Sequence, residues 1–514
     1  MVGSPAHVLD KGINSPTHML HHRSALFIVI GLLCGVHTAR GQSEEDALRF
    51  SNLLPGGTAR SWALGGAIGA VGADPGSVTT NPAGLGLYNT SEFSLTPQFE
   101  VNNSRSDHYG TIAEDNDNRF SFNNISLILS SPNDADSDWR SGTFGVSFDR
   151  QASYHWEERA IGKGVPTTIL QKFVNEATGT APGNLAIDFP FTSNLAYQTY
   201  GIDPLDSTST SYLSQIPFGS PIDQDHRIST SGRLNTTSFF YAANYLDKLY
   251  LGATIGVSGV RYERQTTHRE TSLDTDLQLK DLTYTEKLLT TGSGFDLKVG
   301  VIGRVSSKMR LGLSFHSPKW LQLTDVYTYG MTTNFRVADT QGNTRYIQDS
   351  PDGNFNYRVR TPWNVLASAV YIAGQHGLVS IDYGYTNFRQ AKLNKSADGI
   401  SSYDFSMEND AIHDDFRSTH SVRVGTEWRS GPWYFRGGWG IWPDAYADSD
   451  ARQGTSYMRY TAGFGFRSNH VSIDLAGVYG TRDINYFQYD PALIAPTSER
   501  LTDTRGMLTV AYRP

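Results

Sequence analysis

Cysteine and long apolar runs are what this sequence lacks. Cys34 is the single cysteine among 514 residues, so the rest of the chain has no thiol for a disulfide, a metal site or a nucleophile. The only continuous apolar run covers residues 25–36, which is short of the about 20 residues that a membrane-spanning helix needs. These absences argue against a disulfide-stapled domain and against a helical membrane protein.

A surplus of basic residues is also missing. The chain has 43 Lys and Arg against 51 Asp and Glu, for a formal net charge of −8. Residues 1–41 carry Lys11, Arg23 and Arg40 against Asp10, so the remainder is more acidic still. A negative surface repels phosphate groups, and we therefore expect no nucleic-acid partner.

Residues 1–41 have the pattern of a cleaved secretory signal peptide. A basic stretch ends at Arg23, the apolar core follows, and residues 39–41 offer a cleavage site. Met19 is a second candidate start codon. Cys34 lies inside the core and follows Leu33 rather than a small residue, so we interpret it as part of the signal core and not as a lipid attachment site.

Alternation of apolar and polar residues is abundant beyond residue 90. In residues 309–316, Met309, Leu311, Leu313 and Phe315 fall on one face of a strand, and polar or small residues fall on the other. The same period of two recurs at 295–301, 379–385 and 471–475. This period indicates strands whose two faces meet different environments, and the 50 glycines and 12% aromatic residues are typical of a membrane barrel.

The strand pattern predicts an all-β fold, a transmembrane antiparallel β-barrel of about 14 strands. Long segments joined alternately by short turns and long loops favour this over a soluble sandwich. We expect short turns near residues 247–248, 306–308, 374–377, 430–432 and 468–469. The expected strands are 91–103, 119–131, 142–154, 235–247, 249–267, 281–304, 309–335, 356–373, 377–389, 417–429, 433–444, 456–467, 470–488 and 503–513.

Three connections are polar and need separate treatment. The longest, at about 155–234, is expected to be an external loop, and residues 167–177 within it have a weakly helical pattern with Ile169, Phe173 and Val174 on one side. The acidic pieces 114–118 and 410–415 offer oxygen ligands of the kind that calcium prefers. Neither has the full spacing of a calcium loop, so we interpret both as solvated loops.

The Gly-rich segment 56–86 precedes the first strand. Its glycines Gly65, Gly66, Gly69 and Gly72 have neither the spacing of a dinucleotide turn nor the Lys and Ser or Thr of a phosphate loop. The triplet Asn81, Pro82 and Ala83 fits a capped helical turn, because an Asn oxygen can accept a backbone N–H and Pro fixes φ at the first helical position.

In this segment the chain resembles the long-chain fatty-acid transporter family of the outer membrane (FadL type), in a Bacteroidetes-like branch. The resemblance rests on Asn81, Pro82 and Ala83, on the small residues 57–72 before them, and on the strand at 91–99. It implies that residues 42–90 fold into the lumen as a plug, or hatch, to which the triplet and the four glycines belong, inside a barrel of residues 91–514. Two features differ from the family: the longest loop follows the third strand, and the chain ends Tyr512, Arg513, Pro514.

A luminal hatch needs polar partners on the inner wall of the barrel. Charged residues at inward positions of the expected strands can supply hydrogen bonds and ion pairs, although for any single one of them the simpler expectation is that it fills a wet interior. These luminal candidates are Asp296, Lys298, Arg310, Asp382, Arg423, Glu427, Arg436 and Asp474.

The resemblance implies passive outer-membrane uptake of hydrophobic compounds, such as long-chain fatty acids or aromatic hydrocarbons, through a hatch-gated barrel. An alternative is a scaffold or shuttle barrel that resembles the type IX secretion protein of the PorV type. Expected partners are outer-membrane lipids, a hydrophobic small molecule and the barrel-assembly machinery, with the protein as a monomer.

An enzyme is the least favoured alternative, and we expect no catalytic residue, metal site or cofactor. His316 and Ser317 are adjacent, but neighbouring side chains in a strand face opposite ways and cannot act together as base and nucleophile. A haemin receptor would need a His or Tyr ligand, and spacing singles out none.

Overall fold

The computed structural model describes residues 43–134, 136–396 and 403–514. The expected signal peptide, with Cys34, lies outside these residues. None of the described helices is long and apolar enough to cross a membrane.

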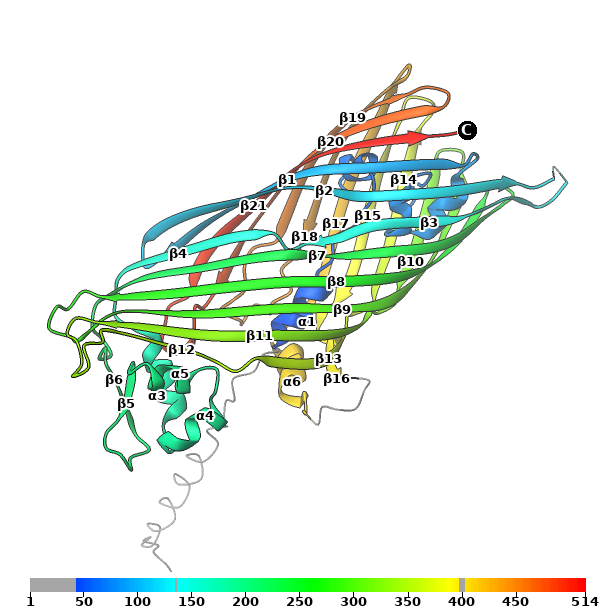
Figure 1. Ribbon diagram of the computed structural model, residues 1–514. Coiled ribbons are helices and arrows are strands. Elements are labelled where there is room, and N and C mark those ends of the chain that lie inside the picture. Colours follow the sequence, from blue (N-terminus) through cyan, green and yellow to red (C-terminus); the bar gives the residue numbers. More distant parts are fainter. Residues whose placement is uncertain (1–42, 135, 397–402) are drawn as a thin grey trace, which may run out of the picture. The chain divides into compact units, whose positions relative to one another are not determined.

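The described chain forms a closed antiparallel β-barrel of 14 strands, as the sequence predicts (Figure 1). Strand β1 (Glu92–His108) pairs with β2 (Thr111–Pro132) on one side and with the last strand, β21 (Thr497–Tyr512), on the other, which closes the sheet. The other strands are β3 (Trp139–Ser153), β4 (Trp156–Val165), β7 (Ile222–Tyr245), β8 (Leu249–Ser272), β9 (Leu279–Ser306), β10 (Met309–His316), β11 (Trp320–Phe335), β12 (Arg345–Asp349), β13 (Gly353–Arg360), β14 (Asn364–Ala373), β15 (Gly377–Asn387), β16 (Lys392–Lys395), β17 (Ser418–Ser430), β18 (Trp433–Trp442), β19 (Tyr457–Arg467) and β20 (Val471–Tyr486).

Some of these elements are parts of one barrel strand. Both β10 and β11 pair with β9, and β14 and β13 continue the next strand round the barrel. In the same way β15 and β16 follow one another along the wall. The short breaks between the parts explain why the 14 expected strands appear as a larger number of elements.

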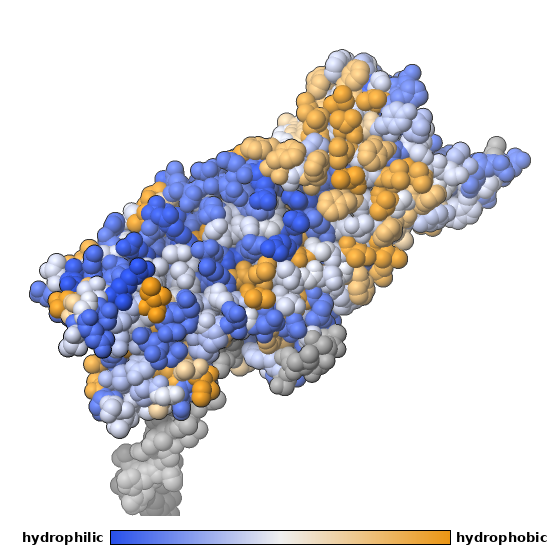
Figure 2. Space-filling model, viewed as in Figure 1, coloured by the Kyte–Doolittle hydropathy of each residue, from blue (hydrophilic) through white to orange (hydrophobic). Residues whose placement is uncertain are grey.

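Exposed apolar side chains form a belt around one end of the barrel, where the short turns and the C-terminus lie (Figure 2). The short turns fall where the sequence places them. Short turns at one end and longer loops at the other are the arrangement of outer-membrane barrels, so the belt faces lipid. Examples of its members are Phe93, Leu127, Phe239, Leu251, Leu297, Leu311, Ile381, Phe435, Leu475 and Val510.

At the other end several strands extend well beyond the belt. Strand β2 begins at Thr111 instead of the expected 119, and β7 begins at Ile222 instead of 235. The acidic piece 114–118 is therefore strand and not loop. The outward face of these extensions is polar because it meets water instead of lipid, so the apolar-out alternation of the belt does not mark them in the sequence.

The long connection after the third strand is shorter and more ordered than the expected loop at about 155–234. Residues 156–165 form β4, and a small helical unit follows, whose Leu170, Phe173 and Leu195 share one apolar core with barrel residues such as Ile222 and Leu282. The helix expected at 167–177 is present as α3 (Ile169–Ala177). The other elements are η4 (Pro182–Asn184), α4 (Leu185–Asp188), α5 (Ser193–Gln198), β5 (Ile202–Pro204) and β6 (Tyr212–Ser214).

A second correction concerns the acidic piece 410–415. It belongs to helix α6 (Ser406–Asp415), whose buried Ile412 packs in a core with Phe416. Burial of Ile412 within this piece and of Phe416 directly after it holds the helix against the barrel. A short helix, η5 (Phe388–Gln390), lies nearby and contacts α6.

The N-terminal segment lies inside the barrel, where Figure 1 shows it in blue. Its elements are α1 (Glu44–Ser51), α2 (Ala59–Ala63), η2 (Pro75–Val78) and η3 (Pro82–Leu87). Nearly every residue from Gly56 to Gly86 is buried. The fold is thus a barrel with a luminal hatch, as the sequence predicts.

Candidate functional site: hatch, cavity and wall break

An ion cluster joins the hatch to the wall. Arg60 on α2 donates to Glu427 on β17 through Nε at 2.8 Å and Nη2 at 3.1 Å. Arg436 donates to the same carboxylate and, at 2.7 Å, to Asp474. All four side chains are buried. Buried charges are tolerated only when they are paired in this way, so the cluster fixes the position of α2.

A second contact holds the middle of the hatch. The backbone N–H of Gly69 donates to Asp382 on β15 at 3.1 Å, and Arg423 lies 3.3 Å from the same carboxylate oxygen. Arg310 donates to the carbonyl of Val71 at 2.9 Å. Two of the expected luminal residues do not reach the hatch in this way: Lys298 pairs with Asp296, which also binds Lys319.

Asn81 forms hydrogen bonds both to other hatch residues and to the wall of the barrel. Its Oδ1 accepts the backbone N–H of Ala83 at 3.1 Å, which caps η3. Its Nδ2 donates to the carbonyls of Gly69 at 2.8 Å and Val301 at 3.3 Å. The capped turn expected from the sequence is present, and the cap also acts as a connection between hatch and barrel.

Glycines on the wall make room for the hatch. A Cβ atom at Gly300 on β9 would overlap Asn81 Oδ1, and one at Gly252 on β8 would overlap the backbone of Pro82. A Cβ at Gly438 on β18 would overlap the backbone N of Gly65. Gly65, Gly66 and Gly72 of the hatch have positive φ, which Gly adopts readily. The close packing therefore depends on glycine from both sides.

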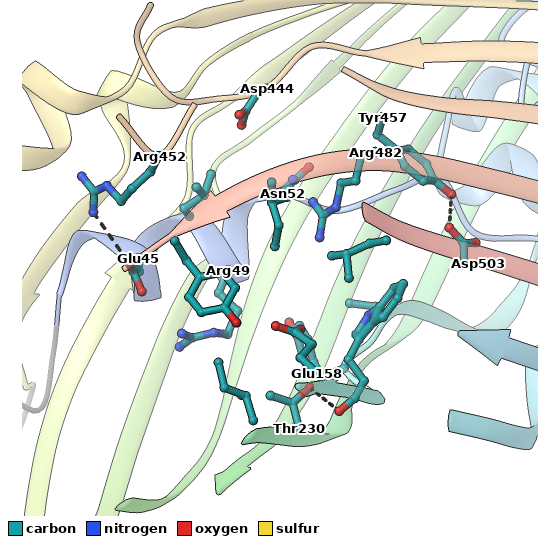
Figure 3. A pocket seen from close by; sticks show the side chains of 18 of the residues that line it. Glu45, Arg49, Asn52, Glu158, Thr230, Asp444, Arg452, Tyr457, Arg482 and Asp503 are labelled. Carbon is teal, nitrogen blue, oxygen red and sulfur yellow. Dashed lines mark hydrogen bonds and ion pairs between the residues drawn. The ribbon is translucent and has the colours of Figure 1, made fainter. Parts of the chain in front are cut away.

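A cavity of about 970 Å³ is lined by Glu45 and Arg49 of α1 (Figure 3) and also by Trp62 of the hatch. Aromatic rings line much of it: Trp62, Trp156, Trp442, Tyr154, Tyr262, Tyr446, Tyr457, Tyr486, Phe487 and Tyr489. Six arginines also line it: Arg49, Arg150, Arg264, Arg452, Arg482 and Arg505. Six carboxylates face them: Glu45, Glu158, Glu286, Asp444, Asp450 and Asp503.

The wall of the barrel is broken beside this cavity. Strands β2 and β3 are hydrogen-bonded only from Asn124 and Asp149 toward the short-turn end. At that point β3 has an irregularity between Arg150 and Ala152, and such bulges bend a strand. The rest of β2 toward the loop end pairs with β1 alone. The ladder is therefore interrupted next to Phe122, which is exposed on the outer surface.

Beyond the bulge the chain turns inward as β4. Three buried side chains of β1 donate to backbone carbonyls of this segment: Asn102 to His155, Ser104 to Glu157 and Ser106 to Arg159. Because inward-facing side chains of β1 make these bonds, β4 lies on the inner side of β1. On its other side β4 pairs with β7, so the side-chain bonds from β1 satisfy carbonyls that face the break, where no strand pairs with β4.

Only a few side chains bridge the break. Arg119 of β2 lies 3.0 Å from Nδ1 of His155, which joins β3 to β4. Asp117 lies 3.8 Å from the same nitrogen. Burial, together with the nearby Arg119 guanidinium, lowers the pKa of His155 to about 4. The imidazole is thus neutral at ordinary pH, so its Nδ1 can accept a hydrogen bond from the Arg119 guanidinium.

Comparison with solved structures identifies the fold to which this geometry belongs. No family model matches the sequence, and no curated protein does so either. Solved structures match. A FadL homologue of Pseudomonas aeruginosa has a TM-score of 0.52 at 13% identity, over 90% of this chain and 99% of that one. The toluene transporter TodX of P. putida has a TM-score of 0.52 at 11% identity, over 90% and 99%. This chain has the FadL-type fold.

Within the FadL-type fold, the structure brings together most of the residues that the sequence singles out. Asn81, the hatch glycines and five luminal candidates, Arg310, Asp382, Glu427, Arg436 and Arg423, meet at the interface between hatch and wall, and Asp474 supports it through Arg436. Sequence reasoning missed Arg60, the cavity residues and the break. Glycine at inward strand positions was an available signal for the contact surface of the hatch.

Proposed function

We propose that this protein is an outer-membrane transporter that takes up hydrophobic compounds passively and releases them sideways into the membrane. One observation carries the proposal: the cavity reaches the break in the wall. Gln98, Asn123 and Arg150 line the cavity, and they lie on β1, β2 and β3 where the ladder between β2 and β3 stops. A compound in the cavity therefore lies beside an exit that opens toward lipid.

The hatch supports the same route. Buried from Gly56 to Gly86 and fixed by the ion cluster of Arg60, it occupies the lumen at the level of the apolar belt. A straight passage along the barrel axis is blocked while the hatch is in place. Apolar compounds partition from water into hydrocarbon without an energy source, so a side exit into the bilayer suffices for passive uptake.

The substrates that we propose are small hydrophobic compounds of the class that includes long-chain fatty acids and aromatic hydrocarbons. TodX is by name a toluene transporter, and transport rather than catalysis is the proposed role. The comparisons give no support to the secretion-scaffold alternative. We further propose that the chain acts as a monomer, enters the membrane through the barrel-assembly machinery, and uses Asn81, Pro82 and Ala83 to hold the hatch.

Cross-linking across the break tests the proposal. Cysteines at Arg119 and His155, in a Cys34→Ser background, flank the break and leave no other thiol in the chain. A cleavable bismaleimide should lower entry of N-phenyl-1-naphthylamine into cells that carry the barrel about tenfold, and cleavage of the linker should restore it.

A pair on a continuous part of the wall serves as the control. Asp483 and Arg500 face each other in the β20–β21 ladder, so cross-linked cysteines there should leave entry of the probe unchanged. Entry that is insensitive to the link between positions 119 and 155, with complete cross-linking shown by mass, would refute lateral release.

A further inference from the structure

We propose that the outer face of β13 and β16 binds the phosphate groups of a lipid in the outer leaflet of the membrane. The two strands lie beside α6 (Figure 1). Four basic side chains carry the proposal: Arg358, Arg360, Arg389 and Lys392. Because this face is on the outside of the barrel, it acts independently of the transport route through the lumen.

Strand register places three of these residues together on the outer surface. Arg360 is the ladder partner of Lys392, and Arg358 lies two positions from Arg360, so the three share one face of the wall. The intervening Val359 and its partner Leu393 are buried in a core that they share with α1 inside the barrel. The three basic side chains are exposed and therefore point outward.

The fourth residue, Arg389, is held beside them by η5. Arg360 donates through Nη2 to the carbonyl of Gln390 at 3.4 Å, which places η5 next to β13. Arg389 and Arg358 donate through Nε to other backbone carbonyls, at 2.8 and 2.6 Å. Each bond uses only part of a guanidinium and fixes its orientation, so further N–H donors remain for a ligand.

The four positive charges are not neutralised by the described part of the chain. Among the described residues, including the acidic helix α6 that contacts β16, no Asp or Glu forms an ion pair with any of the four. Like charges directly opposite one another destabilise a sheet, so Arg360 and Lys392 repel each other until an anion binds. Exposed arginines on other strands are paired with carboxylates: Arg105 with Glu114, Arg159 with Asp225, and Arg500 with Asp483.

The cluster lies at the edge of the lipid-facing belt. Arg360 is the ladder partner of Trp320, whose ring stacks on Phe295 at a centroid distance of 5.0 Å. Both rings are exposed, and tryptophan favours the level of the lipid headgroups. The short turns, which are periplasmic in outer-membrane barrels, lie at the other edge of the belt. The edge with the cluster therefore faces the outer leaflet.

A phosphorylated lipid headgroup fits this place. Arginine binds phosphate through two parallel N–H···O bonds, and lysine adds a compact positive charge. Basic residues near a membrane surface each strengthen binding of anionic lipids about fivefold. A soluble anion can meet the same charges but has no acyl chain to pack on Trp320 and Phe295, so a lipid uses more of this surface.

Native mass spectrometry of the folded natural protein in a non-ionic detergent tests the proposal. The probes are diphosphorylated lipid A and the same lipid with both phosphates removed. The phosphorylated form should bind about tenfold more tightly or better, and inorganic phosphate at the same concentration should not displace it. Equal binding of the two forms, or displacement by inorganic phosphate, overturns the proposal.

A triple variant locates the site. Arg358→Gln/Arg360→Gln/Lys392→Gln should weaken binding of the phosphorylated lipid roughly 100-fold, at about fivefold for each basic residue. Binding of the dephosphorylated lipid should not change. Because the three residues are exposed, the variant should fold, and heat-dependent mobility in SDS gels reports whether it does.

A second triple variant is the matched control. It removes the same charge from exposed arginines that are paired with carboxylates: Arg105→Gln/Arg261→Gln/Arg500→Gln. This variant should bind the phosphorylated lipid as tightly as the natural protein. Equal losses in the two triple variants would mean that only net charge matters, and no loss in the first would place the lipid elsewhere. Either result overturns the proposal.

Discussion

A substitution at Gly300, a residue of the barrel wall, offers a direct way to loosen the hatch without changing any hatch residue. A Cβ atom at this position on β9 would overlap Asn81 Oδ1 and lie 3.2 Å from Pro82 Cδ. Asn81 has little room to move aside, because the neighbouring strand β10 is also close: a Cβ at Gly312 would lie 3.1 Å from its Nδ2. We therefore expect Gly300→Ala to displace the Asn81 side chain.

The size of the effect follows from the bonds at stake. Asn81 makes three hydrogen bonds, to Ala83, Gly69 and Val301. At about 1 kcal/mol each, their loss costs the docked hatch roughly 2–3 kcal/mol. This corresponds to a roughly 30- to 150-fold increase in the undocked population.

Hydrogen exchange followed by mass spectrometry measures that population. Peptides from residues 64–87 should exchange faster in Gly300→Ala by the stated factor, while peptides from the barrel strands should not change. Gly303→Ala on the same strand is the control, because a Cβ there meets nothing within 4 Å. Equal protection of the hatch in the two variants would refute the reasoning.

Two further perturbations test the ion cluster and the break. Arg60→Met should destabilise the folded barrel by about 3 kcal/mol in urea unfolding, because Glu427 loses one of its two buried arginine partners. The Arg60→Met/Glu427→Met double variant should recover part of this stability. A double variant whose destabilisation equals the sum of the two single effects would contradict the pairing. Folding lowers the pKa of His155 from 6.5 to about 4. The neutral imidazole therefore contributes stability that is present above pH 6.5 and lost as the pH falls toward 4. Hydrogen exchange of residues 150–160, corrected for the intrinsic rate, should rise from pH 7 to pH 5 in the natural protein and not in His155→Gln.

Much of the barrel could be predicted because alternation is a local property. A strand between lipid and a polar lumen needs an apolar residue at every second position. For the strands from β8 to β21, this pattern gives the majority of the strand ends to within a few residues. The prediction failed where the outer face of a strand meets water instead of lipid. At the outer ends of β2 and β7 that face is polar, so these segments lack the apolar alternation of the belt and were assigned to loops.

The hatch could be predicted in part. Asn81 and Pro82 predict a capped turn through local chemistry, and the small residues before them predict close packing. Which wall residues they meet was not visible in the sequence. Arg60 looks like any exposed arginine until β17 brings Glu427 beside it, 367 positions later in the chain.

The sequence by itself therefore determined the strands, their number, the lipid-facing side and the compact segment before the barrel, because each depends on neighbouring residues in the chain. The closed tertiary structure decided the ion cluster, the mixed charge of the cavity and the break between β2 and β3. The physical reason is that charges and cavities arise from residues hundreds of positions apart, and the break arises from where β3 bends relative to β2. Neither the pairing of distant charges nor the bend of β3 relative to β2 can be predicted from one continuous segment of the sequence.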